Sequence, residues 1–287
     1  MHDWTLDLLR RIRSDEGRDA NPAVEKHEEN TMLNGKRMVT LALVLPLVLL
    51  ASVPGAHGAY SVVDVSNGGA IKGKVTFAGS LPEDAIEEIT ITKNTEVCGE
   101  GQRRIVWIDV KDSALRGVFV FLDGIEQGMA WPEPDGGQNL IVQKNCRFTP
   151  WAQVVKPGSL TVRNSDSGVL HNINARELIG VERGRPVRRT IFNVGQPEMG
   201  DIEQELKVRR SPFVAINCEA HNFMFGYMMA PEHPYAVVVD DRGAFVIDNV
   251  PPGTYTLKAW HPKLGLKSAE VTVSAGAAAE MSFEFAN

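Results

Sequence analysis

Residues 217–229, with the sequence NCEAHNFMFGYMM, hold one cysteine, one histidine and three methionines in a short stretch. Cys218, His221 and Met224 follow one another at three-residue steps, and the chain has only three cysteines. A second histidine, His171, stands upstream in the polar sequence NSDSGVLHNINA. Thiolate, imidazole and thioether groups are all ligands of transition metals. This pattern therefore predicts a metal site.

One thiolate, two imidazoles and a weak thioether make up the ligand set of a blue-copper electron-transfer centre. The thiolate binds copper covalently, neutral imidazoles suit both Cu(I) and Cu(II), and a distant thioether favours Cu(I). A tight loop between two strands, joined by a neighbouring loop, could bring such ligands together at one end of a β-sandwich. Zinc, which also binds cysteine and histidine, is the alternative metal.

Residues 36–58 have the pattern of a secretory signal peptide. Lys36 and Arg37 are basic, residues 38–53 are apolar, and residues 56–58 (AHG) offer the small side chains of a cleavage site. The apolar stretch is short for a membrane span, so an uncleaved anchor is the alternative. We expect a periplasmic or otherwise exported protein, which contacts a membrane only if this segment is uncleaved.

The N-terminal residues 1–35 are charged with mixed sign, unlike the start of a signal peptide. We expect them to be a disordered extension or the product of a mis-set start codon, since a start at Met32 would give an ordinary signal sequence. Export would place the three cysteines in an oxidising compartment. A disulfide between Cys98 and Cys146 is then the simplest arrangement, with two separate buried thiols as the alternative.

Residues 60–287 consist of short alternating segments between glycine and proline turns, which favours an antiparallel β-sandwich or barrel. AIKGKVTFAG (residues 70–79) and GDIEQELKV (200–208) are expected strands, and the former is a candidate partner for the C-terminal strands. LPEDAIEEI (81–89) is expected to be a short helix or a loop. A soft boundary is expected near residues 231–234.

These motifs resemble those of the cupredoxins. HNI (171–173) with CEAHNFM (218–224) is similar to the short-loop motif of amicyanin-type proteins. Residues 68–287 resemble an exported bacterial family, often labelled methylamine-utilisation-like, whose members carry a carboxypeptidase-regulatory-like β segment. The chain departs from the family pattern at Phe223, where a tryptophan is usual, and at Pro262, where an acidic residue often follows the histidine.

The resemblance implies an all-β fold. A cupredoxin-like Greek-key β-sandwich would span residues 60–232, and a small prealbumin-like β module would span 233–287. His171, Cys218 and His221 would be the trigonal copper ligands and Met224 the axial one. Met228 and Met229 are competing candidates for the axial position, although they are more typical of core fillers. Asn172, which follows the histidine ligand, is expected to brace the ligand loop.

The function that this reading implies is that of a type 1 copper protein carrying single electrons between redox proteins, of the cytochrome or dehydrogenase type. We expect electrons to leave through His221, with its ring edge at the surface beside Phe223. A copper chaperone, or a structural β-sandwich with a vestigial site, are the alternatives.

Other features of the sequence favour no catalytic role. It has no nucleophile elbow, zinc-protease or phosphate-loop motif, and too few histidines for a multicopper oxidase. The formal net charge of −6 gives no reason to expect a nucleic-acid partner. His233 and His261 each precede proline and are expected to be structural, with a second metal site as the alternative.

Overall fold

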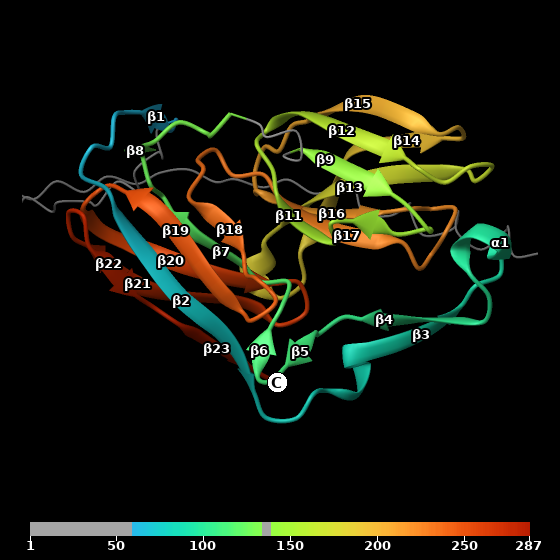
Figure 1. Ribbon diagram of the computed structural model, residues 1–287, viewed down its shortest axis with the longest axis horizontal. Helices are drawn as coiled ribbons and strands as arrows, with labels where there is room; N and C mark the ends of the chain where they lie inside the picture. Colours follow the sequence, from blue (N-terminus) through green and yellow to red (C-terminus); the bar gives the residue numbers. More distant parts are fainter. Residues whose placement is uncertain (1–58, 134–138) are drawn as a thin grey trace, which may run out of the picture. The chain divides into compact units, whose positions relative to one another are not determined.

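The computed structural model describes residues 59–133 and 139–287 (Figure 1). The expected extension (1–35) and signal segment (36–58) lie outside the described residues. No helix in the two described ranges is both long enough and apolar enough to cross a membrane. The fold is almost entirely β, as the alternating segments predict.

The first sandwich carries the predicted ligand residues and consists of two sheets (Figure 1). One sheet has the strand order β10-β9-β12-β15, with bounds Phe148–Thr149, Leu140–Gln143, Gly158–Asn164 and Gly200–Leu206. The other has the order β11-β17-β16-β13-β14, with bounds Ala152–Val154, Phe225–Met229, Phe213–Asn217, His171–Ile179 and Val187–Gln196.

The core of this sandwich comes from the side chains that alternate inward along the strands. Leu160 and Val162 of β12 share one buried cluster with Ile173 of β13 and Ile216 of β16. The expected strand at 200–208 is present as β15. The sheets are mixed rather than purely antiparallel, because β9 pairs in parallel with β12 and β11 pairs in parallel with β17.

The second sandwich also has two sheets. One has the order β18-β7-β20-β21, with bounds Ala236–Val238, Phe119–Asp123, Gly253–His261 and Gly265–Val273. The other has the order β19-β2-β6-β5, with bounds Ala244–Val250, Gly69–Ala78, Ala114–Leu115 and Val110–Lys111. Strands β22 (Ala278–Glu280) and β23 (Phe283–Ala286) pair in parallel with β2.

The predicted division at residue 232/233 does not separate the two cores. Ile71 of β2 and Val120 of β7 lie in one buried cluster with Leu257 of β20 and Phe285 of β23. The strand expected at residues 70–79 does pair with the C-terminal strands. The second core is therefore assembled from both ends of the described chain, because β2 and β7 satisfy the backbone groups of strands that come much later in sequence.

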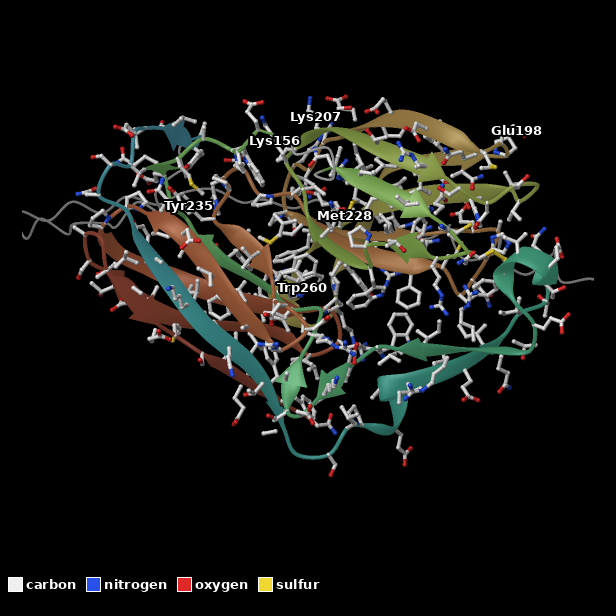
Figure 2. All side chains as sticks on the ribbon, viewed as in Figure 1. Lys156, Glu198, Lys207, Met228, Tyr235 and Trp260 are labelled. Atoms are coloured by element: carbon white, nitrogen blue, oxygen red, sulfur yellow. A yellow bond between two sulfur atoms is a disulfide. The ribbon has the colours of Figure 1, made fainter. Side chains whose placement is uncertain are left out.

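A third cluster joins the outer face of sheet β18-β7-β20-β21 to that of sheet β11-β17-β16-β13-β14. Phe213 of β16 packs against Trp260 of β20 with ring centroids 4.4 Å apart, and against Phe121 of β7 at 5.6 Å. Met229 is completely buried in the same cluster as Trp260, which Figure 2 labels. This cluster therefore packs against the outer face of β16 and β17, the two strands that the cysteine loop connects.

The remaining elements are short. They are β1 (Ser61–Val62), which pairs with β8 (Gln127–Gly128), the 3-10 turns η1 (Glu83–Ala85) and η2 (Val181–Arg183), the hairpin of β3 (Ile86–Thr90) and β4 (Gln102–Val106), and the single-turn helix α1 (Thr95–Cys98). Residues 81–89, expected as a short helix or loop, contain η1 followed by β3. Residues 91–105 contribute Ile91, Cys98 and Ile105 to the core of the first sandwich.

Candidate metal centre

Three of the predicted ligands meet at one end of the first sandwich. The metal-binding atoms of His171, Cys218 and His221 all lie within 4.8 Å of one another, and all three residues are buried. His171 is the first residue of β13, and the other two lie on the loop between β16 and β17. Because β16 pairs with both β13 and β17, the sheet itself brings residues far apart in sequence together.

The loop of residues 218–224 is closed by its own backbone. The Cys218 N–H donates to the Met224 carbonyl oxygen at 3.0 Å, and the Met224 N–H donates to the His221 carbonyl oxygen at 3.0 Å. These bonds satisfy backbone groups that would otherwise be buried without partners. Met224 is buried in the same core cluster as Cys218, so the loop directs both sulfur-bearing residues inward.

Asn172 ties this loop to β13. Its side-chain Oδ1 accepts from the backbone N–H of Glu219 at 2.6 Å and from that of Ala220 at 3.3 Å. Its own backbone N–H points at the Cys218 Sγ at 3.4 Å. An N–H directed at sulfur stabilises a thiolate. The brace expected from its position after His171 is therefore made by real contacts, and its effect on a metal stays a prediction.

His171 is held by one nitrogen and has the other free. Its Nε2 lies 2.8 Å from Asp166 Oδ2, and the residue is fully buried. Its Nδ1 is also buried and has no hydrogen-bond partner in the described part of the chain. A buried nitrogen without a partner is costly, and a ligating histidine usually bonds a carboxylate or carbonyl through its other nitrogen. This arrangement fits a metal ligand.

His221, like His171, has one ring nitrogen beside a side-chain oxygen. Its Nε2 lies 3.0 Å from Asn94 Oδ1, while its Nδ1 lies 3.6 Å from the Cys218 Sγ. Burial, together with the nearby His171, Lys93 and Arg103, lowers the pKa of His221 to about 4. The ring is therefore neutral at pH 7, which leaves a nitrogen lone pair available for a metal.

The donor set is thus two imidazole nitrogens and one sulfur, converging in a buried space. Soft and borderline donors of this kind suit copper and zinc, not magnesium or calcium. His171, Cys218 and His221 are the residues that would hold the ion, with Met224 adjacent on the same loop. Met228 lies in β17 and is fully buried in the first core, and Met229 belongs to the third cluster, as expected of core fillers.

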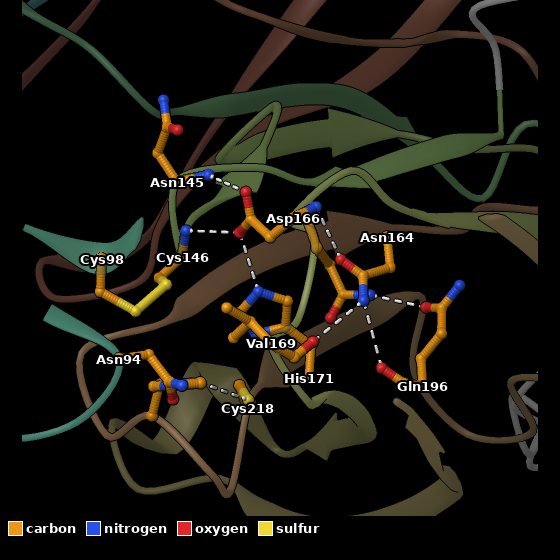
Figure 3. A network of polar contacts seen from close by, with 12 residues as sticks. Asn94, Cys98, Asn145, Cys146, Asn164, Asp166, Val169, His171, Gln196 and Cys218 are labelled. Atoms are coloured by element: carbon orange, nitrogen blue, oxygen red, sulfur yellow. Dashed lines mark hydrogen bonds and ion pairs between the residues drawn. A yellow bond between two sulfur atoms is a disulfide. The ribbon is translucent and has the colours of Figure 1, made fainter. Parts of the chain in front are cut away.

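A polar network behind His171 was not anticipated from the sequence (Figure 3). Asp166 accepts from the backbone N–H groups of Asn145 at 2.7 Å and Cys146 at 2.9 Å, in addition to its contact with His171. The Asp166 N–H donates to Asn164 Oδ1 at 2.9 Å. The signal was present as the polar turn NSDSG just before His171, but the turn alone does not reveal which residue faces the ring.

The ring edge of His221 and the neighbouring Phe223 do not lie at the surface, where the electron exit was expected. His221 is only 2% exposed and Phe223 only 5%. Residues 94–103 cover them: Asn94 bonds the His221 ring, and the Arg103 guanidinium lies over the Phe223 ring, 4.5 Å from its centroid. Sequence reasoning missed this cover because nothing in residues 91–105 resembles a part of the ligand motif.

The end of the ligand loop also borders a cavity of about 450 Å³. Phe223, Met224 and Phe225 line it, and Phe225 stacks on Trp107 with ring centroids 4.2 Å apart. Arg104 and Arg147 also line the cavity, and each is exposed. Within the described residues neither has an ion pair.

The other sequence predictions concern residues outside the centre. Cys98 and Cys146 form the expected disulfide, and Cys218 is the free cysteine. The ring of His233 lies 6.0 Å from that of Tyr235, and its Nδ1 accepts from the Tyr235 N–H. His261 Nδ1 accepts from the N–H groups of Lys263 and Leu264. Neither histidine belongs to a cluster of metal-binding groups among the described residues.

Replacing Asn172 with alanine is expected to loosen the ligand loop without unfolding the sandwich. Loss of an outer hydrogen-bond partner typically weakens metal binding about 10- to 100-fold. We expect faster transfer of bound Zn(II) or Co(II) to a chelator, measured by absorbance. Asn193→Ala is the matched control, because Asn193 bonds the side chains of Asn172 and Glu219 but no loop N–H. Equal release rates in both variants would contradict the bracing role.

Comparison with known proteins finds limited similarity. A profile of the family described as polysaccharide lyase family 4, domain II, matches residues 231–281, and no curated protein matches the chain. A purple cupredoxin from Nitrosopumilus maritimus is 17% identical, over 32% of this chain and 98% of that one, with a TM-score of 0.25. A proline-to-glycine variant of amicyanin in its reduced Cu(I) form is 16% identical, over 34% and 87%, also at 0.25.

A third similar structure is the copper-containing nitrite reductase from Thermus scotoductus SA-01. It is 14% identical, and the match covers 37% of this chain and 26% of that one at a TM-score of 0.25. At these TM-scores the likenesses assign no function to this chain. The geometry of the buried histidines and cysteine is what bears on function.

Proposed function

We propose that this protein is a mononuclear copper protein that carries single electrons. The observation that carries the proposal is the buried convergence of His171, Cys218 and His221, together with the buried His171 Nδ1 that has no hydrogen-bond partner among the described residues. When bound, copper supplies a couple between Cu(II) and Cu(I). The protein would be exported, and the Cys98–Cys146 disulfide supports this because disulfides persist in oxidising compartments.

The chain's own contribution is to fix the donors before the metal arrives. Asp166 and Asn94 orient the two imidazoles, and Asn172 holds the cysteine loop against β13. Donors fixed by hydrogen bonds and core packing move little when the charge at the centre changes. A small change in structure lowers the energetic cost of electron transfer, which suits a carrier.

Copper storage or delivery is the rival function, and one observation weighs against it. Cys218 and His221 are each only 2% exposed. A chaperone passes its ion to a partner by ligand exchange, which requires a thiolate that the partner can reach. A vestigial site is also disfavoured, because such a site would have lost donors, whereas the three donors here still meet.

The electron route in this proposal runs through the cavity beside Met224. His221 is covered by residues 94–103, whereas Phe223, Met224 and Phe225 reach the cavity wall. The partner would be a redox protein that presents a small acidic patch. Arg104 and Arg147 at the opening favour such a patch, and opposite charges accelerate encounter between redox partners.

The test is oxidation of the copper-loaded, reduced protein by small oxidants, followed by stopped-flow absorbance. We expect oxidation by anionic hexacyanoferrate(III) and by a cationic cobalt(III) complex. The double variant Arg104→Glu/Arg147→Glu is expected to react with the anionic oxidant about tenfold more slowly than the wild type at low salt. Its reaction with the cationic oxidant should not be slowed. Arg183→Glu, on the exposed turn η2, is the control.

The outcomes separate the function from the route. If neither oxidant takes an electron from the copper-loaded protein, the carrier function is refuted. If the protein is oxidised but the arginine variants react like the wild type, the function stands and the cavity is not the route.

A further inference from the structure

The Cys98–Cys146 disulfide lies close to both histidines of the centre. Figure 3 shows it in one view with His171 and Asp166. Both sulfur atoms lie within 4.8 Å of a His221 ring nitrogen and of each other. The Cys146 sulfur also lies within 4.8 Å of Asp166 and His171 ligand atoms. Both half-cystines are buried. The disulfide is therefore in the immediate surroundings of the candidate ligand atoms, not in a distant part of the fold.

On one side, the disulfide holds the residue that orients His221. Asn94 precedes the single-turn helix α1, whose last residue is Cys98. The Asn94 carbonyl oxygen accepts from the N–H groups of Val97 at 3.0 Å and Cys98 at 2.7 Å, while its side chain bonds the His221 ring. A four-residue helix has almost no stability of its own. The covalent bond at Cys98 therefore helps to keep Asn94 in place.

On the other side, the disulfide holds the backbone that orients His171. The N–H groups of Asn145 and Cys146 both donate to the Asp166 carboxylate, which in turn bonds the His171 Nε2. To present them, Asn145 and Cys146 adopt left-handed backbone angles, with φ of 50° and 53°. Residues other than glycine adopt this conformation only at an energetic cost. Cross-linking Cys146 helps to keep its backbone there.

Arg103 joins the two sides a second time. Its guanidinium donates to the carbonyl oxygens of Cys146 at 2.5 Å, of Asn145 at 3.2 Å and of Cys98. Burial, and then the nearby Arg147, lower the pKa of Arg103 to about 10, so it remains a cation at pH 7. The two segments that orient the two rings are thus bound to each other by one covalent bond and one buried cation.

We propose that the Cys98–Cys146 disulfide is a positioning element of the metal centre, which sets the orientation of both imidazoles through Asn94 and Asp166. This rests on the proposed metal-binding function of His171, Cys218 and His221. Without the disulfide, both outer hydrogen bonds lose their covalent anchor at once. The rings then sample orientations in which the ligating nitrogens no longer converge.

The test compares the Cys98→Ser/Cys146→Ser double variant with wild type, each as the full exported chain loaded with Co(II). Zn(II) transfer to a chelator gives a second readout. We expect release of metal to become about 10- to 100-fold faster and the Co(II) absorption spectrum to change. Asn94→Ala, which keeps the disulfide, is expected to reproduce part of both effects and covers the case in which the double variant does not fold.

A purely structural disulfide gives a different pattern. Removing a purely structural disulfide would lower the free energy of unfolding by up to about 4 kcal/mol, and would leave the Co(II) spectrum and release rate of the folded variant unchanged. Glu177→Gln is the stability-matched control, since Glu177 makes no contact with the centre. The proposal is overturned if the rate of metal release rises as much in Glu177→Gln as in the double variant. It is also overturned if the release rate rises neither in the double variant nor in Asn94→Ala. A wild-type protein that binds no metal refutes the proposed function itself.

Discussion

Replacing Cys218 with serine is expected to abolish the intense visible absorption that the proposed copper centre would give the Cu(II)-loaded protein. Such absorption would arise from charge transfer between thiolate sulfur and copper, and Cys218 is the free cysteine of the chain. A hydroxyl is a poorer ligand for copper than a thiolate. Affinity should therefore fall by more than the 10- to 100-fold that loss of an outer partner costs. Absorption spectra and competition with a copper chelator measure both effects.

The matched control for this variant is Met228→Leu. Met228 is fully buried in β17 but is not on the ligand loop, so its replacement conserves volume in the core. The copper spectrum should be unchanged. If the Cys218 variant keeps the band, or if the Met228 variant loses it, the assignment of ligands is incorrect.

Replacing Glu177 with glutamine is expected to lower the free energy of unfolding by about 3 kcal/mol. Glu177 is fully buried, and its Oε1 accepts from the N–H groups of Arg209, Arg210 and Ser211 at 2.8, 2.5 and 2.9 Å. Its Oε2 accepts from the Arg189 Nε at 2.6 Å. An amide removes the negative charge and turns an NH₂ group toward the Arg189 cation, and broken buried charge networks cost several kcal/mol.

Because of the Glu177 carboxylate, we expect the free energy of unfolding to depend on pH. Burial alone would raise the pKa of Glu177, but the three backbone N–H groups and Arg189 outweigh burial and lower it from 4.5 to about 2. A depressed pKa contributes stability that is present above pH 4.5 and is lost as the pH falls toward 2. A shift of this size corresponds to about 3 kcal/mol.

Thermal and urea unfolding of wild type and variant between pH 2 and pH 7 test this prediction. The two proteins should differ by about 3 kcal/mol at pH 7, or roughly 6–12 °C in Tm, and converge toward pH 2. Glu182→Gln is the control, because the Glu182 side chain is 57% exposed and its pair with Arg183 should contribute less than about 1 kcal/mol. A constant difference across this pH range would contradict the account.

The sequence was most informative where the chemistry is local. Cys218, His221 and Met224 share one short loop, so their spacing alone indicated a shared site. The link to His171 came from the resemblance, because a histidine followed by an asparagine matches the upstream part of the cupredoxin motif. The disulfide followed from cysteine number and compartment, without any knowledge of where it lies.

The sequence was least informative about contacts made across the fold. Nothing local to Asn94 indicates that it meets His221, 127 residues later. The pairing of β2 and β7 with the C-terminal strands likewise depends on which sheet edges are free after folding, not on the composition of either strand. Residues 94–103 bury His221 through contacts of this kind, and this is why its ring edge was wrongly expected at the surface.

The most direct test of the copper account is the visible and EPR spectrum of the purified wild-type protein with one equivalent of Cu(II). A thiolate and two imidazoles held as in this structure predict an intense visible band and a small copper hyperfine splitting, both removed by Cys218→Ser. A protein that binds Cu(II) without a strong visible band and with the large splitting of ordinary copper complexes, or that takes up only zinc, would contradict it.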